Sequence, residues 1–441
     1  MKEQMKDSGI EWIGKVPSSW ELIRMKDCSY MKGRIGWQGL TANEFIEEGP
    51  FLITGTDFEN GRVIWDRCYH ISEKRYEKAK PIQVEVNDLL VTKDGTIGKL
   101  AFIDSLPGKA SLNSHLLVIR PLENKYINQY LFWVLSSSIF KGYYSLVSYG
   151  STMDSLSQEK VGEFKFYIPC INEQKVIADY LDEKCSKLDE IIADLEKQIE
   201  LLENYRLSII TETMTKGLNK NIDLKESNTP FVNKIPNHWE DKRIKYLIEG
   251  IKDGTHGSFD RVDDGELLLS AKNVFNDGIH ITDNESMISK KDYKSIVSNG
   301  YPKKGDVLLS CVGTVGRTCV YDFDYPIAFQ RSTIFLRPLK EINSFYLSYA
   351  LQSLPMLIQE KNLINKSAQE GLYMGAVKEL YIPITYDMSE QLQIVEYLSN
   401  VLKTIDEKIV LKNKSLEYIK RYKSSLIYEY VTGKKRVKVG E

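Results

Sequence analysis

The sequence predicts an α+β fold in which one module occurs twice, each copy being a mixed globular domain followed by a long helix. Three observations support this prediction. Short motifs recur in the same order in the two halves of the chain, short apolar runs alternate with turns and short helices, and two long stretches carry apolar residues at heptad spacing.

The repeat shows most clearly in pairs of matching motifs. The stretch 14–21 (GKVPSSWE) recurs as 233–240 (NKIPNHWE), which displaces its tryptophan by 239 − 20 = 219 positions. The glycines of 95–99 (GTIGK) recur in 313–317 (GTVGR), at 313 − 95 = 218. Three more pairs follow in order: Arg120-Pro121 with Arg337-Pro338, Tyr167-Ile168-Pro169 with Tyr381-Ile382-Pro383, and Glu173-Gln174 with Glu390-Gln391. Collinear matches with a drifting offset indicate a duplication with small loop insertions and deletions.

Each globular half mixes strands with helices. The apolar, β-prone runs 89–92 and 307–310 read as buried strands, as do 115–119 and 333–336, each of which is closed by Arg-Pro. The stretches 128–138 and 344–357 are expected to form helices. The order of these elements indicates α+β rather than a regular βαβ alternation.

Two long helices are expected to follow the globular halves. Pro169 ends the preceding strand, Asn172 is a suitable N-cap, and Glu173 places negative charge in the first turn. Two apolar rows then keep heptad spacing: Leu181, Leu188, Leu195, Leu202 and Ile209, with Cys185, Ile192 and Ile199. The second copy repeats the pattern, with Leu398, Ile405 and Ile419 beside Leu402, Ile409 and Leu416, interrupted at Lys412.

A helix of this length spans about 65 Å, and its apolar stripe must be buried. The other copy's helix is the simplest partner, and pairing two equivalent modules in a pseudo-twofold way makes the coiled-coil pair antiparallel. A long helix that packs only on its own domain is the alternative. The expected organisation is a globular domain at 1–170, a helix at 171–217, a linker at 218–230, a second globular domain at 231–388 and a second helix at 389–434.

Composition limits the setting of the protein. No apolar run is long enough to span a bilayer, no signal peptide is visible, and the six cysteines are scattered, which favours a reduced, cytoplasmic protein. A net charge of −2 argues against nonspecific coating of nucleic acid. It is compatible with a sequence reader that concentrates a few cations at one surface or takes affinity from a basic partner.

Motifs for catalysis are missing. The stretch 228–231 (NTPF) lacks the double proline of an amino-methyltransferase, and 95–99 has the wrong spacing for a P-loop. The acids at 263–266 lack the following lysine of a metal-dependent nuclease, and five dispersed histidines do not predict a metal site. The sequence therefore predicts neither catalytic residues nor a bound metal.

Candidate DNA contacts in the first copy gather after residue 31. The stretch 32–39 combines the cations Lys32 and Arg34 with Trp37, Gln38 and three glycines, which allow close backbone approach. A turn with a packing tryptophan is an equally good interpretation. Further candidates are Lys93 and Lys99 at the Gly-Thr-x-Gly loop, whose amides could hold a phosphate, and Tyr149 and Ser151 before the last strand. A tight turn between strands, and core packing of the tyrosine, are the alternatives.

The corresponding places in the second copy have different chemistry. The stretch 252–258 (KDGTHGS) replaces 32–39, and the remaining candidates lie at the second Gly-Thr-x-Gly loop and before the last two strands. The candidates of this copy are Lys252, Thr255, His256, Arg317, Arg331 and Tyr373. Divergence within otherwise parallel modules is what two readers of different sequences would show.

The ordered motifs resemble the specificity subunit of type I restriction–modification systems. Lys-x-Pro-x-x-Trp, an Asn/Gly-Asp pair that opens a leucine-rich strand (NDLL at 87–90, GDVLL at 305–309) with Gly-Thr-x-Gly, and Ile-Pro leading to Glu-Gln all occur in both halves. The stretch 253–256 (DGTH) is similar to one common in that family. One departure is that three extra residues separate Ile382-Pro383 from Glu390-Gln391, so the start of the second helix is uncertain in the sequence.

The resemblance implies that each globular domain is a target-recognition domain for one half of a split DNA site, with the helices as spacer. It implies as partners double-stranded DNA, two methyltransferase subunits that use S-adenosylmethionine, and motor–nuclease subunits that use ATP with Mg²⁺. This chain would bind none of these cofactors, have no catalytic activity and need no membrane. A coiled-coil scaffold that assembles partners without reading DNA is the rival hypothesis.

Overall fold

The computed structural model describes residues 4–34, 40–148, 156–364 and 371–437. The chain divides into two compact units, one formed by residues 1–195 with 414–441 and the other by 196–413. Each unit therefore contains one globular copy, the first part of the helix that follows it, and the last part of the other copy's helix. Among the described residues, no helix has the length and apolarity needed to cross a membrane.

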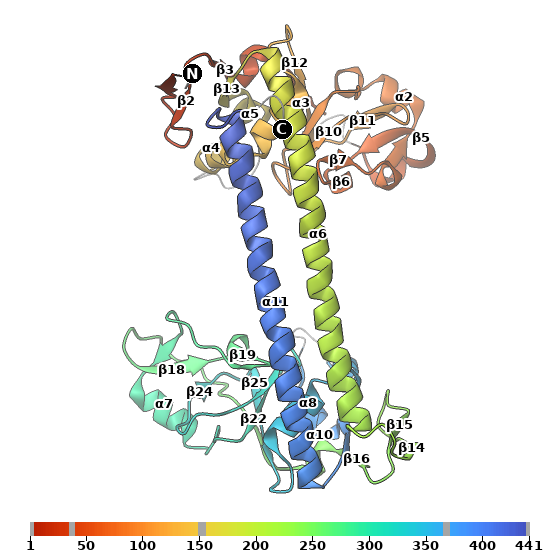
Figure 1. The fold of residues 1–441 in the computed structure, drawn as a ribbon, viewed down its shortest axis with the longest axis vertical. Helices are drawn as coiled ribbons and strands as arrows, with labels where there is room; N and C mark the ends of the chain where they lie inside the picture. The colour runs from red at the N-terminus through yellow and green to blue at the C-terminus, as the bar shows by residue number, and fades with distance from the viewer. Residues whose placement is uncertain (1–3, 35–39, 149–155, 365–370, 438–441) are drawn as a thin grey trace. The chain divides into compact units, whose positions relative to one another are not determined.

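The first unit is built around a four-stranded antiparallel sheet with the order β10-β9-β12-β4 (Figure 1). Its strands are β4 (Ser29–Gly33), β9 (Leu89–Thr92), β10 (Leu100–Phe102) and β12 (Leu116–Pro121). A second sheet has the order β11-β5-β8, with β11 (Ala110–Leu112) parallel to β5 (Phe45–Ile53) and β8 (Tyr69–Ile71) antiparallel to it. The predicted strands at 89–92 and 115–119 thus lie at the centre of the domain, where β9 is completely buried.

Short elements complete the first globular copy. Three two-stranded sheets pair β1 (Met5–Asp7) with β2 (Lys15–Pro17), β3 (Glu21–Arg24) with β13 (Lys165–Ile168), and β6 (Phe58–Glu59) with β7 (Arg62–Val63). The short helices are α1 (Met25–Cys28), α2 (Glu73–Glu77), α3 (Asn128–Ser136), α4 (Ser138–Ser148) and α5 (Gln158–Glu163).

The second globular copy repeats this topology strand for strand. Its four-stranded sheet has the order β23-β22-β25-β17, formed by β17 (Ile248–Asp253), β22 (Val307–Ser310), β23 (Thr318–Val320) and β25 (Thr333–Pro338). The three-stranded sheet is β24 (Ala328–Phe329), β18 (Glu266–Leu269) and β21 (Met287–Ile288), again with one parallel pair. The duplication and the α+β class predicted from the motifs are confirmed.

The remaining elements of the second copy also match. The two-stranded sheets pair β14 (Leu224–Glu226) with β15 (Lys234–Pro236), β16 (Glu240–Arg243) with β26 (Tyr381–Ile384), and β19 (Val274–Phe275) with β20 (Gly278–Ile279). Its helices are α7 (Lys290–Val297), α8 (Ser344–Leu351), α9 (Leu354–Leu363) and α10 (Met374–Glu379). The segment 218–230, expected to be a linker, therefore contains β14. The helix expected at 344–357 is broken after Leu351, because Ser353 is extended and starts a new helix ahead of Pro355.

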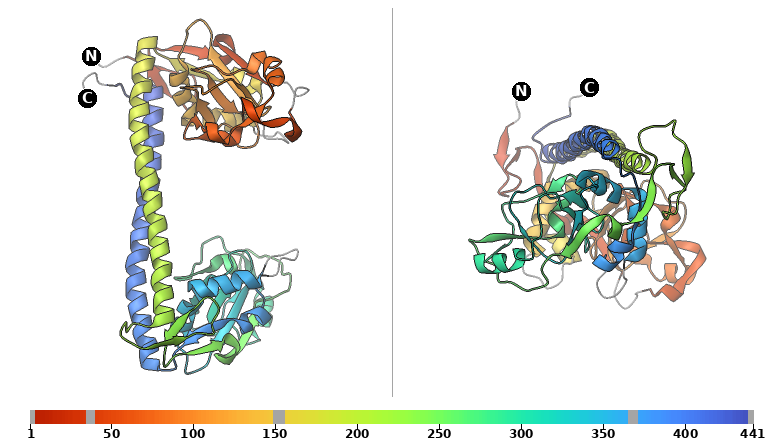
Figure 2. Two further views of the ribbon diagram at one scale, coloured as in Figure 1. Left: turned by 90° about the vertical axis from the view of Figure 1, so that its right-hand side faces the viewer. Right: turned by 90° about the horizontal axis from the view of Figure 1, so that it is seen from below.

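The long helices are α6 (Ile171–Lys216) and α11 (Met388–Val431), and they lie side by side in antiparallel directions within each unit (Figures 1 and 2). In the first unit Lys423 Nζ lies 2.6 Å from Asp189 Oδ1, and the rings of Tyr180 and Tyr430 pack at a tilt with centroids 4.6 Å apart. In the second unit Arg206 Nε lies 3.1 Å from Asp406 Oδ1. The antiparallel coiled-coil pair expected from the heptads is confirmed.

The helix starts differ slightly from those expected. α6 begins at Ile171, so Asn172 lies inside the helix rather than at its N-cap. α11 begins at Met388, where the Asp387 carboxylate accepts a hydrogen bond of 2.9 Å from the Ser389 amide. Lys412, which interrupts the heptads, turns out to be paired, since its ammonium donates to the side-chain carbonyl of Gln198.

The repeated Trp and Gln motifs join the globular copies to the helices. A Cβ at Gly433, which follows α11, would lie 2.4 Å from Pro17 and 3.0 Å from Trp20, and one at Gly217 would lie 3.4 Å from Trp239. Both glycines have positive φ, as helix C-terminal caps require. Each tryptophan therefore packs against the end of the other copy's helix.

The buried glutamine at the start of each long helix makes a matching set of hydrogen bonds. The Gln174 side chain accepts from the Ile127 amide (3.0 Å) and donates to Pro169 O (2.9 Å). Gln391 does the same with the Asn343 amide (2.7 Å) and Thr385 O (2.9 Å). The strand register pairs Ile168 with Glu21 and Ile384 with Glu240, so the two Tyr-Ile-Pro motifs do not occupy equivalent positions. Only one extra residue lies between β26 and α11, and the anchor is kept.

A buried ion pair explains two other repeated motifs. Arg120 makes a bidentate contact with Asp88, at 2.6 and 2.7 Å, and Arg337 makes the same contact with Asp306, at 2.8 and 2.8 Å. Each pair ties the start of β9 or β22 to the end of β12 or β25. The hydrogen bond to Asp306 raises the pKa of Arg337.

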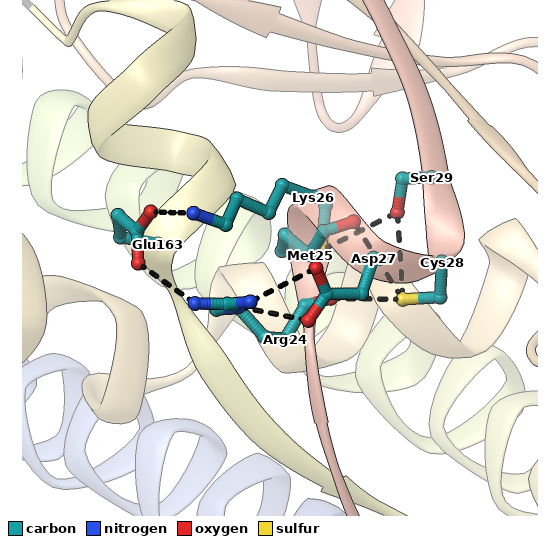
Figure 3. Close-up of polar contacts among 7 residues, drawn as sticks. All are labelled: Arg24, Met25, Lys26, Asp27, Cys28, Ser29 and Glu163. Atoms are coloured by element: carbon teal, nitrogen blue, oxygen red, sulfur yellow. Dashed lines mark hydrogen bonds and ion pairs between the residues drawn. The ribbon is translucent and has the colours of Figure 1, made fainter.

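A more exposed ion cluster recurs at the joint between α1 and α5 (Figure 3). The Glu163 carboxylate contacts both Lys26 and Arg24, and Arg24 also pairs with Asp27 at 2.8 Å. In the second copy Glu379 contacts Arg243 at 2.8 Å and Lys245 at 2.9 Å. The cluster lies on the surface, so we expect it to orient the segment before β4 and β17 rather than to hold the fold together.

The buried pair predicts an asymmetric response to mutation. Arg337→Met should destabilise the protein by about 3–5 kcal/mol, because Asp306 is left buried without its cation. The double variant Asp306→Leu/Arg337→Met should recover most of this loss. Chemical unfolding measures both, with Lys187→Met on the exposed Lys187–Glu183 pair as a control that leaves the midpoint unchanged. A double variant as unstable as the single one would contradict this account.

Candidate nucleic-acid interface

The candidate residues of the first copy meet at one edge of its four-stranded sheet. β12 pairs with both neighbours so that Leu117 faces Gly33 at the end of β4 and Leu116 faces Thr92 at the end of β9. The hairpin turn from β9 to β10 leaves from the same side. The end of β4 at 33–34 and the loops at 93–99 and 113–115 therefore gather at this edge, which we call the first loop edge.

The second copy has the same arrangement. Asp253 at the end of β17 faces Ile334, and Ser310 at the end of β22 faces Thr333. The segments after β17, between β22 and β23, and before β25 thus form a second loop edge. A bridge between Val312 and Gly371 brings the segment before α10 to the same place. The register of the sheets, which motif spacing alone does not reveal, brings the scattered candidates together.

Three cations of the first copy lie at the first loop edge. Lys32 and Lys99 are exposed and Lys93 is half-buried. The Lys93 amide donates to His115 O at 2.9 Å, which holds the loop before β12 beside the end of β9. Exposed lysine side chains are the groups that contact phosphates in protein–DNA complexes.

Arg34 lies in the interior rather than at the surface. Its Nε donates to Leu112 O at 2.8 Å and its Nη2 lies 3.4 Å from Ser111 Oγ. Burial, with a smaller contribution from the charge of Arg75, lowers the pKa of Arg34 to about 10. In this position Arg34 holds the backbone at Leu112, immediately before the loop 113–115.

A glycine takes this supporting place in the second copy. A Cβ at Gly254 would lie 2.2 Å from Gln330 O and 2.4 Å from Phe329 O, so no larger residue fits. The next amide, that of Thr255, donates to Phe329 O at 2.8 Å. Close backbone contact therefore replaces the buried guanidinium.

The candidates of the second copy also converge. Lys252 and Arg331 are exposed, and the Arg331 amide donates to Thr255 O at 3.0 Å. His256 Nε2 lies 2.6 Å from Asp253 Oδ2, which orients the exposed imidazole. Tyr373 is 52% exposed and follows Leu372, whose amide donates to Cys311 O at 2.8 Å.

The Gly-Thr-x-Gly loops are tight hairpin turns. In the first copy the Gly98 amide donates to Thr92 O and the Lys99 amide to Thr92 Oγ1, both at 2.9 Å. In the second copy the Arg317 amide donates to Ser310 Oγ at 3.0 Å, and the Arg317 guanidinium lies 4.7 Å from the Phe275 ring centroid. These amides are engaged within the turn, so a phosphate contact at these loops would fall to the side chains of Lys99 and Arg317.

Four candidates, Trp37, Gln38, Tyr149 and Ser151, lie outside the described residues. Sequence reasoning in turn missed a pair at the first loop edge, where His115 Nδ1 lies 3.3 Å from Asp94 Oδ2. The two residues are 21 positions apart and belong to no recognisable spacing pattern. Only the pairing of β9 with β12 brings them together.

A buried carboxyl group lies beneath the second Gly-Thr-x-Gly turn. Glu360 of α9 is 2% exposed, its Oε1 has no hydrogen-bond partner among the described residues, and a Cβ at Gly316 would lie 2.8 Å from its Oε2. Burial raises the pKa of Glu360 to about 8. Burial therefore favours the protonated, neutral form of this carboxyl group.

The comparisons with known proteins agree on one family. A family model for the type I restriction modification DNA specificity domain matches residues 17–201 and again 236–418. The chain is 24% identical over 437 residues to the putative type I restriction enzyme MjaX specificity subunit of Methanocaldococcus jannaschii, covering 97% of this chain and 96% of the relative. It is 26% identical to the MjaVIII specificity subunit of the same organism, covering 96% and 95%.

A solved structure shares the fold. The chain aligns with a TM-score of 0.65 and 15% identity, over 95% of its length and 99% of the other, to a chain from work on complex assembly and conformational transition of the type I R-M system. Because the family model covers most of both halves, the chain belongs to the type I restriction–modification DNA specificity family. It is the specificity subunit of such a system.

Glu360 predicts a pH-dependent stability. Between its ordinary pKa of 4.5 and about 8, the folded state holds a proton that the unfolded state releases, so stability falls as pH rises through this range. Glu360→Gln removes this loss, and its advantage should grow by up to about 1.4 kcal/mol per pH unit and level off above pH 8. Urea unfolding at several pH values measures the difference, and a difference independent of pH would contradict the burial argument.

Proposed function

We propose that each globular copy reads one half of a bipartite, asymmetric DNA target. The observation that carries this proposal is the pair of loop edges, which are equivalent in topology and different in side chains. Equivalent positions in the register carry Arg34 and Gly254, and Ser114 and Arg331. A common frame that presents different donors and acceptors reads different bases.

In this proposal the chain directs other subunits to the target and performs no catalysis itself. Its partners are two adenine methyltransferase subunits, with S-adenosylmethionine, and motor–nuclease subunits, with ATP and Mg²⁺.

The long helices support this assignment, because several large apolar side chains on them remain exposed. These are Ile191 (45%), Leu201 (57%), Tyr205 (56%), Val410 (51%), Leu411 (63%), Tyr418 (68%) and Tyr422 (47%). Exposed apolar residues on the helices of each unit indicate surfaces that another protein covers.

Methylation mapping tests the proposed function directly. The chain is produced in cells with its cognate methyltransferase subunit, and methylated adenines are mapped across the genome. We expect one target in two parts separated by unread bases. A continuous target would overturn the bipartite proposal, and no sequence-specific methylation would favour the scaffold hypothesis.

The exposed cations at the loop edges predict a specific salt effect. Lys32→Ala should weaken DNA binding by the complex to a similar degree on all sequences and reduce the slope of log K against log salt by about one. The measurement is a binding titration at several salt concentrations. Lys125→Ala, an exposed lysine beyond the opposite end of β12, serves as the control. An unchanged slope for Lys32→Ala would remove this lysine from the interface.

The exposed apolar residues of the helices predict a defect in assembly. Leu201→Glu/Leu411→Glu should abolish copurification with the methyltransferase subunit, because both side chains would place a charge in an apolar contact. Thermal unfolding of the chain alone should change little, since both residues are more than half exposed. Normal assembly by this double variant would show that the partner binds elsewhere.

A further inference from the structure

A cavity of about 370 Å³ lies beside the β9–β10 turn of the first copy. Its lining includes the rings of Phe58, Phe132 and Phe140, and the lysines Lys99 and Lys141. Both lysines are exposed, whereas Phe58 and Phe140 belong to the domain interior. An aromatic lining that also carries two cations suits a planar, anionic ligand. We call this space the first-copy cavity.

The same place in the second copy is occupied by the chain's own side chains. A Cβ at Gly98 of the first copy would have nothing within 4 Å, whereas one at Gly316 would lie 3.1 Å from Leu357 and 2.8 Å from Glu360. These two residues of α9 stand where α4 carries Lys141 and Tyr144. Gln352 stands where the first copy has Ser136, immediately before the matching serines that begin the next helix.

In the second copy, the side chains that occupy the equivalent place show which backbone groups are available there for hydrogen bonding. The Thr318 amide donates to Asn276 Oδ1 at 3.0 Å, and Thr318 O lies 3.5 Å from Gln352 Nε2. One acceptor and one donor thus satisfy the outward N–H and C=O of a single residue at the edge of the sheet. Two side-chain amides, those of Asn276 and Gln352, together provide this pairing in the second copy.

Leu100 is the equivalent residue of the first copy. It faces Val91 in β9 as Thr318 faces Leu309 in β22, so its N–H and C=O also point away from the neighbouring strand. Leu100 lines the first-copy cavity, and within the described part of the chain no hydrogen bond to its N–H or C=O is present. Ser136 is too short to take the place of Gln352.

We propose that the first-copy cavity binds a nucleobase that carries a phosphate. The partly exposed rings of Phe132 and Tyr144 stack on the base. The N–H and C=O of Leu100 pair with an adjacent acceptor and donor on its edge, and Lys99 and Lys141 contact the phosphate. Every base has an edge with this combination of groups. The ligand is either a free nucleotide or a nucleotide turned out of the DNA helix, and this binding goes beyond the reading of stacked bases proposed above.

Calorimetric titration of the full chain tests the site with the four ribonucleoside monophosphates and with ribose 5-phosphate. We expect saturable binding of at least one monophosphate and none of ribose 5-phosphate, which lacks a base. Ser136→Gln introduces the side chain that fills the second copy, and should weaken binding by about tenfold or more, as loss of a stacked base would. Ser105→Gln, the same change at an exposed turn, should leave binding unchanged.

The result that overturns the proposal is equal binding by wild type and Ser136→Gln, or no binding of any monophosphate. Thermal unfolding within a few degrees of wild type shows that the variant is folded. If Ser136→Gln fails to fold, Lys141→Leu, which introduces the residue of the second copy at an exposed position, replaces it with the same expected direction.

A second arm identifies the source of the base. The complex with its methyltransferase subunits is bound to its mapped target carrying 2-aminopurine at single positions. A fluorescence rise that Ser136→Gln abolishes shows a base drawn from DNA, and its absence, with monophosphate binding retained, shows a free nucleotide. Failure to find any DNA target would contradict the proposed function while leaving the titration with monophosphates intact.

Discussion

The structure depends on one exchange: each globular copy is completed by the end of the other copy's helix. Trp20 packs against Gly433 after α11, and Trp239 packs against Gly217 after α6. The buried Gln174 and Gln391 fix the start of each helix in its own copy. A single copy would therefore leave its tryptophan and one apolar helix stripe uncovered, which explains why the module occurs as a pair in one chain.

The residues that the two copies share are those that build this frame. The Asp88–Arg120 and Asp306–Arg337 pairs tie equivalent strands together, and the Gly-Thr-x-Gly turns close equivalent hairpins. The copies differ where the loops leave the sheet, as at Arg34 and Gly254. The buried contacts of the frame require particular side chains in a fixed geometry. The exposed side chains of the loops can change at little cost in stability.

The periodicity of apolar residues and the internal repeat predicted most of the fold. The buried strands around Leu89 and Val307 and the heptads of both long helices could be predicted because their spacing reflects burial directly. The N-cap at Asp387, strand β14 and the break between α8 and α9 could not, because each depends on tertiary contacts or on a single local hydrogen bond.

The candidate site was predictable only in part. Exposed cations such as Lys32 and Lys252 stand out in sequence because they accompany glycine-rich turns. The burial of Arg34 and the pairing of Asp94 with His115 follow from strand register, which a single sequence does not encode locally. The first-copy cavity could be recognised only by comparing the two copies position by position. Ser136 gives no signal by itself, and its small size matters only because the second copy has Gln352 at the equivalent position.

The most direct test of the account replaces the second globular segment, residues 231–384, by a further copy of residues 12–168. Both loop edges then carry the same side chains on the same frame. Mapping of methylated adenines should show a target whose two parts contain the same half-site, one of them unchanged from the wild type. A target with two different parts, or one in which both parts have changed, would contradict the claim that each copy reads its own half.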